Sequence, residues 1–271
     1  MSHTLVLIGC GNMGFAMARG WLAGDPATVV HVVEPVDELR ERAAGAGASA
    51  VCRLADLPPG LAPDIVFIAV KPNLVEAVLA ECGAFAARGA TFVSVAAGVT
   101  TAAMARCLPP GAAIIRCMPN TPAAIGEGMM VLHAREGVTG DARRLVSALL
   151  STSGVVAWID DEAQMDAVTA ISGSGPAYVF HFIEALTDAG VALGLPAQTA
   201  ALLARQTVRG AGRLAMEAAV DPATLRRQVT SPGGTTAAAL DVLMREERTG
   251  KLVAEAARAA RDRSIELGRS N

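Results

Sequence analysis

The sequence is poor in lysine, histidine and aromatic residues. Only Lys71 and Lys251 are lysines, and the four histidines stand far apart along the 271 residues. Isolated histidines give little support to a Ser-His-Asp triad or to a histidine-based metal site, so we expect no metal. Aromatic residues make up 3% of the chain, so the core must be packed mainly with aliphatic side chains.

Close cysteine pairs, a large excess of charge and long uncharged apolar runs are also missing. Five cysteines at irregular spacing argue against a disulfide framework and indicate a reducing compartment. A net charge of −3 gives no reason to expect nucleic acid or an anionic membrane surface as a partner. Charged residues interrupt every long apolar stretch, and a strand pattern beginning at Leu5 leaves no room for a signal peptide. We therefore expect a cytoplasmic protein.

The order of the apolar runs indicates two domains. Residues 1–159 alternate short β-branched runs with helical stretches, which predicts an α/β domain with a doubly wound Rossmann sheet. After Trp158 the strand pattern stops, and residues 160–271 have the pattern of an all-helical domain. Strands are expected at residues 5–8, 29–33, 65–70, 91–95, 113–116, 129–132 and 155–158.

A glycine-rich turn follows the first predicted strand. Gly9, Gly11 and Gly14 occupy the glycine positions of G-x-G-x-x-G, and a helical pattern begins directly afterwards. The first glycine allows the tight turn, the second lets the backbone approach a pyrophosphate, and the third packs helix against strand. This strand–turn–helix context favours dinucleotide binding over a glycine-rich turn without a ligand.

Polar residues at the ends of later strands extend the predicted cofactor site. Glu34 ends the second strand, 20 residues after Gly14. A carboxylate there accepts hydrogen bonds from a ribose 2′-hydroxyl and repels a 2′-phosphate, so we predict that NADH is used at least as well as NADPH. The alternative is a solvated surface glutamate. Lys71 and Ala96 follow further strands, and Asn120 offers a donor in a loop with two prolines that could instead be only a structural turn.

A second distinctive segment, residues 230–236, reads Thr-Ser-Pro-Gly-Gly-Thr-Thr and precedes an alanine run. This order is typical of a tight turn that opens a helix, with free N–H groups and hydroxyls available to a small anion. A dehydrogenase that acts on a hydroxyl needs a base near its substrate, and Lys251 is the one lysine of the helical half. Reduction of an already protonated C=N bond needs no such base.

These segments resemble the Δ1-pyrroline-5-carboxylate reductase family, whose members catalyse the last step of proline biosynthesis. The resemblance implies an oxidoreductase that transfers hydride from NADPH or NADH to the ring C=N bond of L-1-pyrroline-5-carboxylate and gives L-proline. It also implies a homodimer with interlocked helical domains that bind substrate, and larger rings of dimers such as a decamer. The similar segments are residues 9–14, 69–72, 96–100, 116–122, 165–180 and 221–240.

The fingerprint and the resemblance together give the expected site residues. The dinucleotide is expected to contact Ile8, Gly9, Cys10, Gly11, Asn12, Met13, Gly14, Glu34, Asp56, Ala69, Val70, Lys71, Pro72, Val95, Ala96, Ala97 and Asn120. The cyclic imino acid is expected to contact Ser231, Gly233, Gly234, Thr235, Thr236, Ala237 and Ala238. The resemblance implies that Thr236 is the catalytic residue and hydrogen-bonds the ring nitrogen. Ser231 and the N–H groups after the glycines would hold the carboxylate.

Two other interpretations stay open at this point. A β-hydroxyacid dehydrogenase would have a similar domain order, but the helical half lacks the catalytic lysine that such an enzyme needs. A dinucleotide-binding regulatory module would show no turnover, which the intact Ser231–Thr236 segment argues against.

Overall fold

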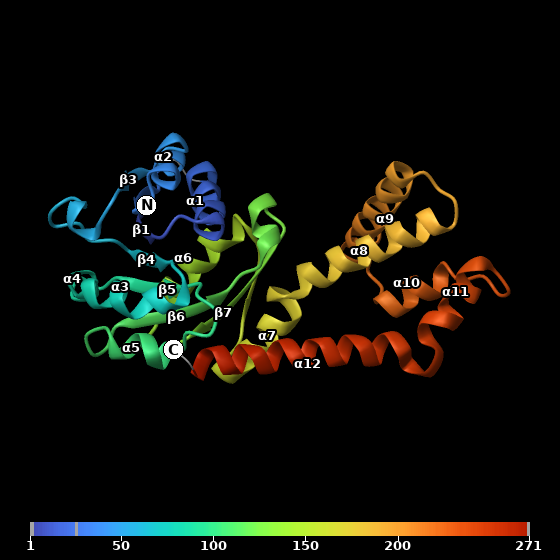
Figure 1. Cartoon of the computed structure of the whole chain (residues 1–271). Helices are drawn as coiled ribbons and strands as arrows, with labels where there is room; N and C mark the ends of the chain where they lie inside the picture. Colours follow the sequence, from blue (N-terminus) through green and yellow to red (C-terminus); the bar gives the residue numbers. More distant parts are fainter. Residues whose placement is uncertain (1–2, 25–26, 270–271) are drawn as a thin grey trace. The chain divides into compact units, whose positions relative to one another are not determined.

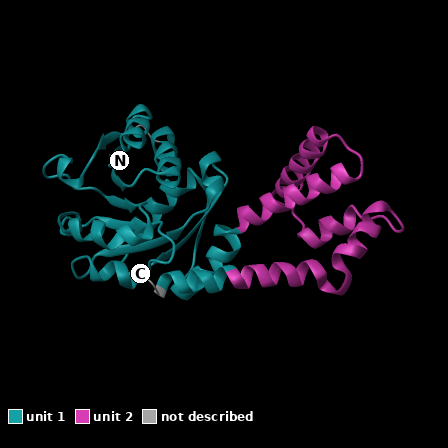
Figure 2. Ribbon diagram, viewed as in Figure 1, with its two compact units in different colours: residues 1–174, 260–271 teal, residues 175–259 magenta. Residues whose placement is uncertain are grey.

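The computed structural model describes residues 3–24 and 27–269, which form two compact units (Figures 1 and 2). The first unit contains the residues up to Ser174 and those from Ala260 on. The second unit is Gly175–Ala259 and consists of helices joined by turns. Among the described residues, no helix is both long enough and apolar enough to cross a membrane.

The first unit is built on one sheet with the strand order β3-β2-β1-β4-β5-β6-β7-β8. Its strands from β3 to β6 are parallel to their neighbours, in the order of a dinucleotide-binding Rossmann fold. The predicted fold class is therefore confirmed. The strands are β1 (Thr4–Ile8), β2 (Val29–Val33), β3 (Ser49–Val51), β4 (Ile65–Ile68), β5 (Thr91–Ser94), β6 (Ala113–Met118), β7 (Gly128–Ala134) and β8 (Gly154–Trp158).

Two features of the sheet were not predicted from the sequence. Strand β3 was missed because Ser49–Val51 is short and lacks a β-branched run. Strand β7 runs antiparallel to β6, whereas β8 runs parallel to β7. The segment between β6 and β7 holds only the 3-10 turn η3 (Thr121–Ile125), which is too short for the crossover that parallel neighbours require.

The helices of the first unit cover a sheet that is apolar on both faces. Leu5 and Leu7 of β1 belong to one buried apolar cluster, while Val6 and Ile8 belong to another. Because successive side chains of a strand point to opposite faces, both faces of the sheet carry a core. The helices are α1 (Asn12–Gly24), α2 (Asp37–Gly45), α3 (Val75–Glu81), α4 (Gly83–Ala86), α5 (Thr101–Arg106), α6 (Gly140–Ser151) and α7 (Met165–Val168).

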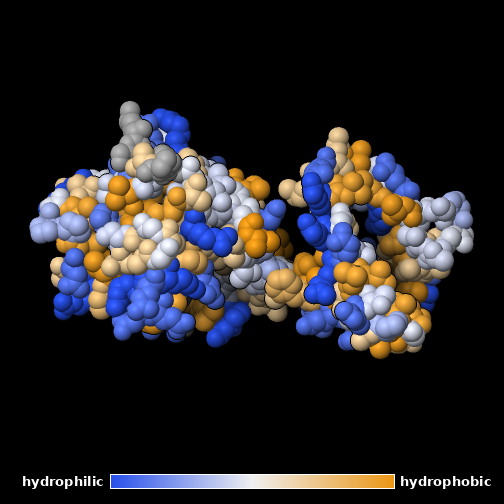
Figure 3. Space-filling model, turned by 90° about the horizontal axis from the view of Figure 1, so that it is seen from above, coloured by the Kyte–Doolittle hydropathy of each residue, from blue (hydrophilic) through white to orange (hydrophobic). Residues whose placement is uncertain are grey.

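The second unit leaves much of its apolar surface uncovered. Helix α8 has no buried residue, and Phe180 and Phe182 on it are 58% and 55% exposed. Figure 3 shows hydrophobic patches over this unit. Its helices are α8 (Gly175–Ala192), α9 (Ala197–Glu217), α10 (Pro222–Gln228), α11 (Thr235–Met244) and α12 (Arg248–Arg269), the last of which ends in the first unit.

The predicted domain boundary, between residues 159 and 160, follows the end of the sheet at Trp158. The first compact unit extends beyond it to Ser174 and takes up the end of α12. There the Ser264 hydroxyl, 5% exposed as a residue, donates a hydrogen bond of 2.7 Å to Asp166 Oδ1. The domain boundary at residue 160 therefore stays a prediction. The first of the two compact units ends its N-terminal stretch at Ser174.

Candidate functional site

The carboxyl ends of parallel strands bring the predicted cofactor residues to one edge of the sheet. Ile8 is in register with Val33 on one side and with Ile68 on the other, and Ile68 is in register with Ser94. The segments that follow these four residues therefore leave the sheet side by side. This edge is the place where open α/β sheets bind ligands.

The three fingerprint glycines have different surroundings. Gly9 has a φ of +88°, and a Cβ there would lie 2.7 Å from the Ala69 carbonyl oxygen. A Cβ on Gly14 would collide with the Gly9 carbonyl oxygen, so Gly14 allows the helix to pack against the turn. A Cβ on Gly11 would meet nothing within 4 Å. Open space in front of Gly11 is what the close approach of a pyrophosphate requires.

The start of helix α1 offers hydrogen-bond donors beside this space. The first backbone bond at this end runs from Phe15 N–H to Gly11 O, at 2.9 Å. The amides of Asn12, Met13 and Gly14 precede it and have no acceptor within the helix. Free amides at a helix N-terminus attract phosphate, so this end of α1 suits the cofactor.

Glu34 is buried and its carboxylate holds the glycine turn in place. The residue is 5% exposed, so the alternative of a solvated surface glutamate is wrong. One carboxylate oxygen accepts the Cys10 N–H at 2.7 Å, and the other accepts the Val36 N–H at 3.0 Å. The carboxylate therefore joins the end of β2 to the turn after β1.

Arg42 is a site residue that the sequence pattern did not identify. Its Nη2 donates to the Cys10 carbonyl oxygen at 2.8 Å and to that of Gly11 at 3.3 Å. Its guanidinium carbon lies 4.1 Å from the centre of the Phe15 ring. The arginine was visible in the sequence on the helix after Glu34, but only the packing of α2 brings it back to the glycine turn.

Other predicted cofactor residues already have protein partners. Asp56, at the end of the turn η1 (Leu54–Asp56), forms an ion pair of 2.9 Å with Arg53, whose hydrogen bond lowers the pKa of the Asp56 carboxyl. Asn120 donates to the Ser172 carbonyl oxygen at 3.0 Å and accepts the Met129 N–H at 2.8 Å. These contacts show that Asn120 joins separate segments, and its contact with a cofactor stays a prediction.

The small-residue segment around Ser172 lies in a helical turn and not in an irregular loop. The Ser174 N–H donates to the Thr169 carbonyl oxygen at 2.8 Å, five residues back, which defines the π-helical turn η5 (Thr169–Gly173). A Cβ on Gly173 would lie 2.6 Å from the Met118 methyl carbon. Small residues here let the turn pack closely while the helix continues.

The predicted substrate segment has the geometry of a turn that opens a helix. Gly234 N–H donates to the Ser231 carbonyl oxygen at 3.0 Å, and Gly233 has a φ of +70°. Helix α11 starts at Thr235, so the amides of residues 235–237 have no acceptor within the helix. Ala238 N–H is already bonded to the Gly234 carbonyl oxygen at 3.1 Å.

Comparison with known proteins identifies the family. The model for pyrroline-5-carboxylate reductase dimerisation matches residues 162–267, and that for coenzyme F420-dependent NADP oxidoreductases matches residues 4–98. The pyrroline-5-carboxylate reductase of Pseudomonas aeruginosa is 40% identical over 264 residues, which cover 97% of this chain and 96% of the relative. The chain belongs to the pyrroline-5-carboxylate reductase family.

Solved structures of pyrroline-5-carboxylate reductases agree in fold over the full length. The enzyme from Coxiella burnetii has a TM-score of 0.92 and 34% identity, with 98% of this chain and 99% of that chain covered. The Plasmodium falciparum pyrroline carboxylate reductase, solved with NADP bound, has a TM-score of 0.82 and 28% identity, with 98% of both chains covered. The family predicted from the sequence is therefore confirmed.

Proposed function

We propose that the protein reduces L-1-pyrroline-5-carboxylate to L-proline with NAD(P)H, the last step of proline biosynthesis. The observation that carries the proposal is that a family member has both a glycine turn open to a pyrophosphate and the Ser231–Gly234 turn that opens a helix. When bound, the reduced nicotinamide supplies the hydride. The chain needs no general base, because the imine nitrogen is protonated before the transfer.

The substrate roles follow from the geometry at the start of α11. We assign the carboxylate of the imino acid to the Ser231 hydroxyl and to the amides of Thr235, Thr236 and Ala237. The Thr236 hydroxyl orients the ring nitrogen. Gly233 and Gly234 let the backbone approach the ligand, and Ala238 supplies only apolar contact because its amide is already bonded within the helix.

An assay with racemic pyrroline-5-carboxylate and each nicotinamide cofactor tests the proposal. We expect consumption of the reduced cofactor and formation of L-proline. A folded protein that binds dinucleotide but does not turn over the imine would contradict the proposal and support a regulatory module. Oxidation of β-hydroxyacids in place of imine reduction would support the alternative dehydrogenase.

We also propose that NADH is used at least as well as NADPH. The Glu34 carboxylate lies at the end of β2, where its charge opposes a 2′-phosphate. Arg40, which could offset that charge, donates to the Glu34 and Pro35 carbonyl oxygens and pairs with Asp37. The arginine therefore has protein partners in place of a phosphate.

Glu34→Gln is expected to shift binding towards NADPH by about tenfold in the ratio of the two dissociation constants, because a negative charge near the 2′-phosphate is removed. Titration of the variant with NADH and NADPH measures the shift. Asp64→Asn is the matched control. Asp64 also accepts a backbone N–H, from Thr4 at 2.8 Å, but it lies at the amino ends of the strands, away from the predicted cofactor site. A strong NADPH preference in the unaltered protein would refute the proposal.

A second copy of this chain is the partner that we propose for the helical unit. Helix α8 is apolar on most sides yet has no buried residue, and Leu193 beyond it is 86% exposed. A helix of this composition is normally covered by other helices. We propose an interlocked homodimer that can assemble into larger rings such as a decamer.

Sedimentation equilibrium at micromolar concentration is expected to give a mass at least twice that of one chain. Phe182→Glu should weaken the association, because it places a charge on an apolar surface that the partner covers. His181→Glu serves as the control, since His181 is an exposed polar neighbour on the same helix. A monomeric unaltered protein would contradict this proposal.

We place the protein in the cytoplasm. All five cysteines are free thiols, and three of them are buried. Burial raises the pKa of Cys117 to about 12, which keeps this thiol protonated and unreactive. Unpaired cysteines suit a reducing compartment.

A further inference from the structure

The loop between β5 and α5 has a place in the sheet that gives it a specific part of the cofactor. Strand β5 lies on the β4–β6 side of β1, away from β2 and Glu34. The two halves of a Rossmann sheet each bind one half of a dinucleotide, and the β2 side binds the adenosine. Residues 95–100, which follow β5, therefore lie in the half that receives the nicotinamide riboside.

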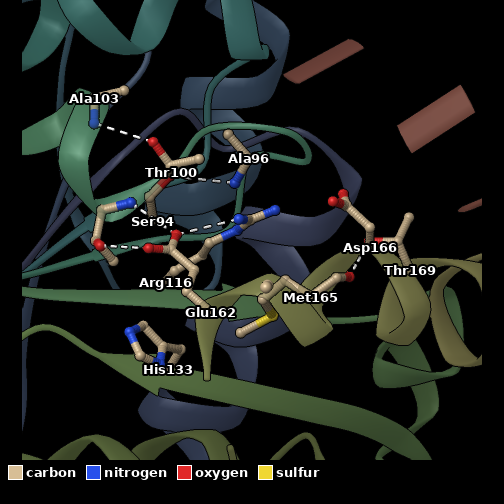
Figure 4. A network of polar contacts seen from close by, with 12 residues as sticks. Ser94, Ala96, Thr100, Ala103, Arg116, His133, Glu162, Met165, Asp166 and Thr169 are labelled. Atoms are coloured by element: carbon tan, nitrogen blue, oxygen red, sulfur yellow. Dashed lines mark hydrogen bonds and ion pairs between the residues drawn. The ribbon is translucent and has the colours of Figure 1, made fainter. Parts of the chain in front are cut away.

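Glu162 holds the far end of this loop. One carboxylate oxygen accepts the Thr101 N–H at 2.8 Å and the Arg116 Nη1 at 3.1 Å. The other accepts the Thr101 hydroxyl at 2.6 Å. Figure 4 shows the Glu162 and Arg116 side chains pointing towards one another beside the loop. The carboxylate thus joins α5 and β6 through the turn η4 (Glu162–Gln164).

The charge of Glu162 is maintained at neutral pH. Burial raises the pKa of the Glu162 carboxyl. Hydrogen bonds from Thr101 and the charge of Arg116 lower this pKa by more than burial raises it, so the net shift is downward. Arg116 is 4% exposed and sits in the strand core. The Glu162 carboxylate therefore carries a negative charge beside the buried Arg116 guanidinium, and the two charges balance each other.

The rest of the loop is held in the same place. The buried Ser94 hydroxyl accepts the Ala96 N–H at 3.2 Å, and Thr100 caps α5 by accepting the Ala103 N–H at 3.1 Å. In the middle, Gly98 has a φ of +77° and a Cβ on it would lie 3.3 Å from Gly268 N at the end of α12. The loop is therefore held by hydrogen bonds at its start and end, and its middle packs closely against Gly268.

We propose that Glu162, with Arg116, is a positioning residue for the nicotinamide half of the cofactor. It fixes Thr101 and thereby the backbone of residues 95–100. The Arg116 side chain is 5% exposed and that of Glu162 is 21% exposed, and an ion pair so largely removed from water adds little stability compared with an apolar replacement. General stability is therefore a weak reason for this arrangement. The stronger reason is that the pair holds the backbone of residues 95–100 in the position where we propose that it contacts the cofactor. The inference rests on the proposed reductase function for its ligand.

Thr101→Val tests the inference, because it removes the hydroxyl donor to Glu162 and keeps the size of the side chain and the amide. We expect the dissociation constant for NADH to rise by about five- to tenfold in Thr101→Val and in Glu162→Gln. The dissociation constant for ADP, which lacks the nicotinamide riboside, should stay within about twofold of the wild-type value. In steady-state assays the KM for NADH should rise without an equal rise in the KM for the imine.

Two further variants separate positioning from stability. Thr101→Ser keeps the hydroxyl and should restore NADH binding. Thr139→Val removes the hydroxyl that caps α6, which accepts the Ala142 N–H at 3.2 Å, and so tests the effect of lost stability alone. Its affinity for NADH should match the wild-type value even where its thermal midpoint falls.

Each other outcome has a definite meaning. Equal losses of NADH and ADP affinity in Thr101→Val, or unchanged NADH affinity in both Thr101→Val and Glu162→Gln, overturn the inference. If the unaltered protein reduces the imine, the proposed function stands in either case. An unaltered protein that binds none of NADH, NADPH and ADP overturns the proposed function and this inference with it.

Discussion

Replacing Thr236 with alanine is expected to lower kcat/KM for the cyclic imine by about 10- to 150-fold, which corresponds to the loss of one hydrogen bond to a charged group, about 1.5–3 kcal/mol. The hydroxyl stands in the first turn of α11, beside the amides that we propose to hold the carboxylate. Because the proposed contact is to the substrate alone, the dissociation constant for NADH should hardly change. Steady-state kinetics and a separate dinucleotide titration measure the two effects.

Thr236→Ser is the matched variant, since it keeps the hydroxyl in the same helical position. It should retain most of the activity that Thr236→Ala loses. Wild-type kinetics in Thr236→Ala would refute the assignment of this hydroxyl. A parallel loss of NADH affinity would instead show that the start of α11 affects the cofactor site.

Replacing Gly11 with valine is expected to weaken dinucleotide binding by about 100-fold while the folded protein stays intact. A Cβ on Gly11 meets no protein atom within 4 Å, and this glycine does not have a positive φ. The added side chain would therefore occupy only the space that we propose for the pyrophosphate. Overpacking a close contact costs about 1–3 kcal/mol, or about 5- to 150-fold in affinity.

Gly45→Val is the control for this experiment, because Gly45 also has nothing within 4 Å and does not have a positive φ. Calorimetric titration with NADH and a thermal melt should show lost binding with a retained transition in Gly11→Val only. Unchanged affinity in Gly11→Val would mean that the pyrophosphate lies elsewhere. Gly14→Val, by contrast, should impair folding, since its Cβ would collide with the Gly9 carbonyl oxygen.

The strands and the glycine turn could be predicted because their signals are local. Seven of the eight strands lie within a few residues of their predicted ranges, since buried parallel strands leave continuous apolar runs. The exception, Ser49–Val51, is ordered by pairing with β2 and not by its own composition. The direction of β7 also lay outside the local pattern, since it depends on how the chain turns after Met118.

The partners of the site side chains could not be predicted, because they come from distant parts of the chain. Glu34 bonds to the turn 24 residues earlier, and Thr101 bonds to Glu162, 61 residues later. Asn120, expected to face the cofactor, uses both ends of its amide to join β7 and the π-helical turn. No periodicity or spacing reports such pairings.

The sequence by itself determined the class of sheet, the dinucleotide turn, the turn before α11 and the family, because each depends on residues adjacent in the chain. Only the tertiary structure decided that Glu34 is buried and bonded to the glycine turn, that Arg42 contacts the same turn and that Glu162 holds the loop after β5. Side-chain burial and long-range hydrogen bonds are set by which segments pack together. That packing exists only once the sheet has assembled.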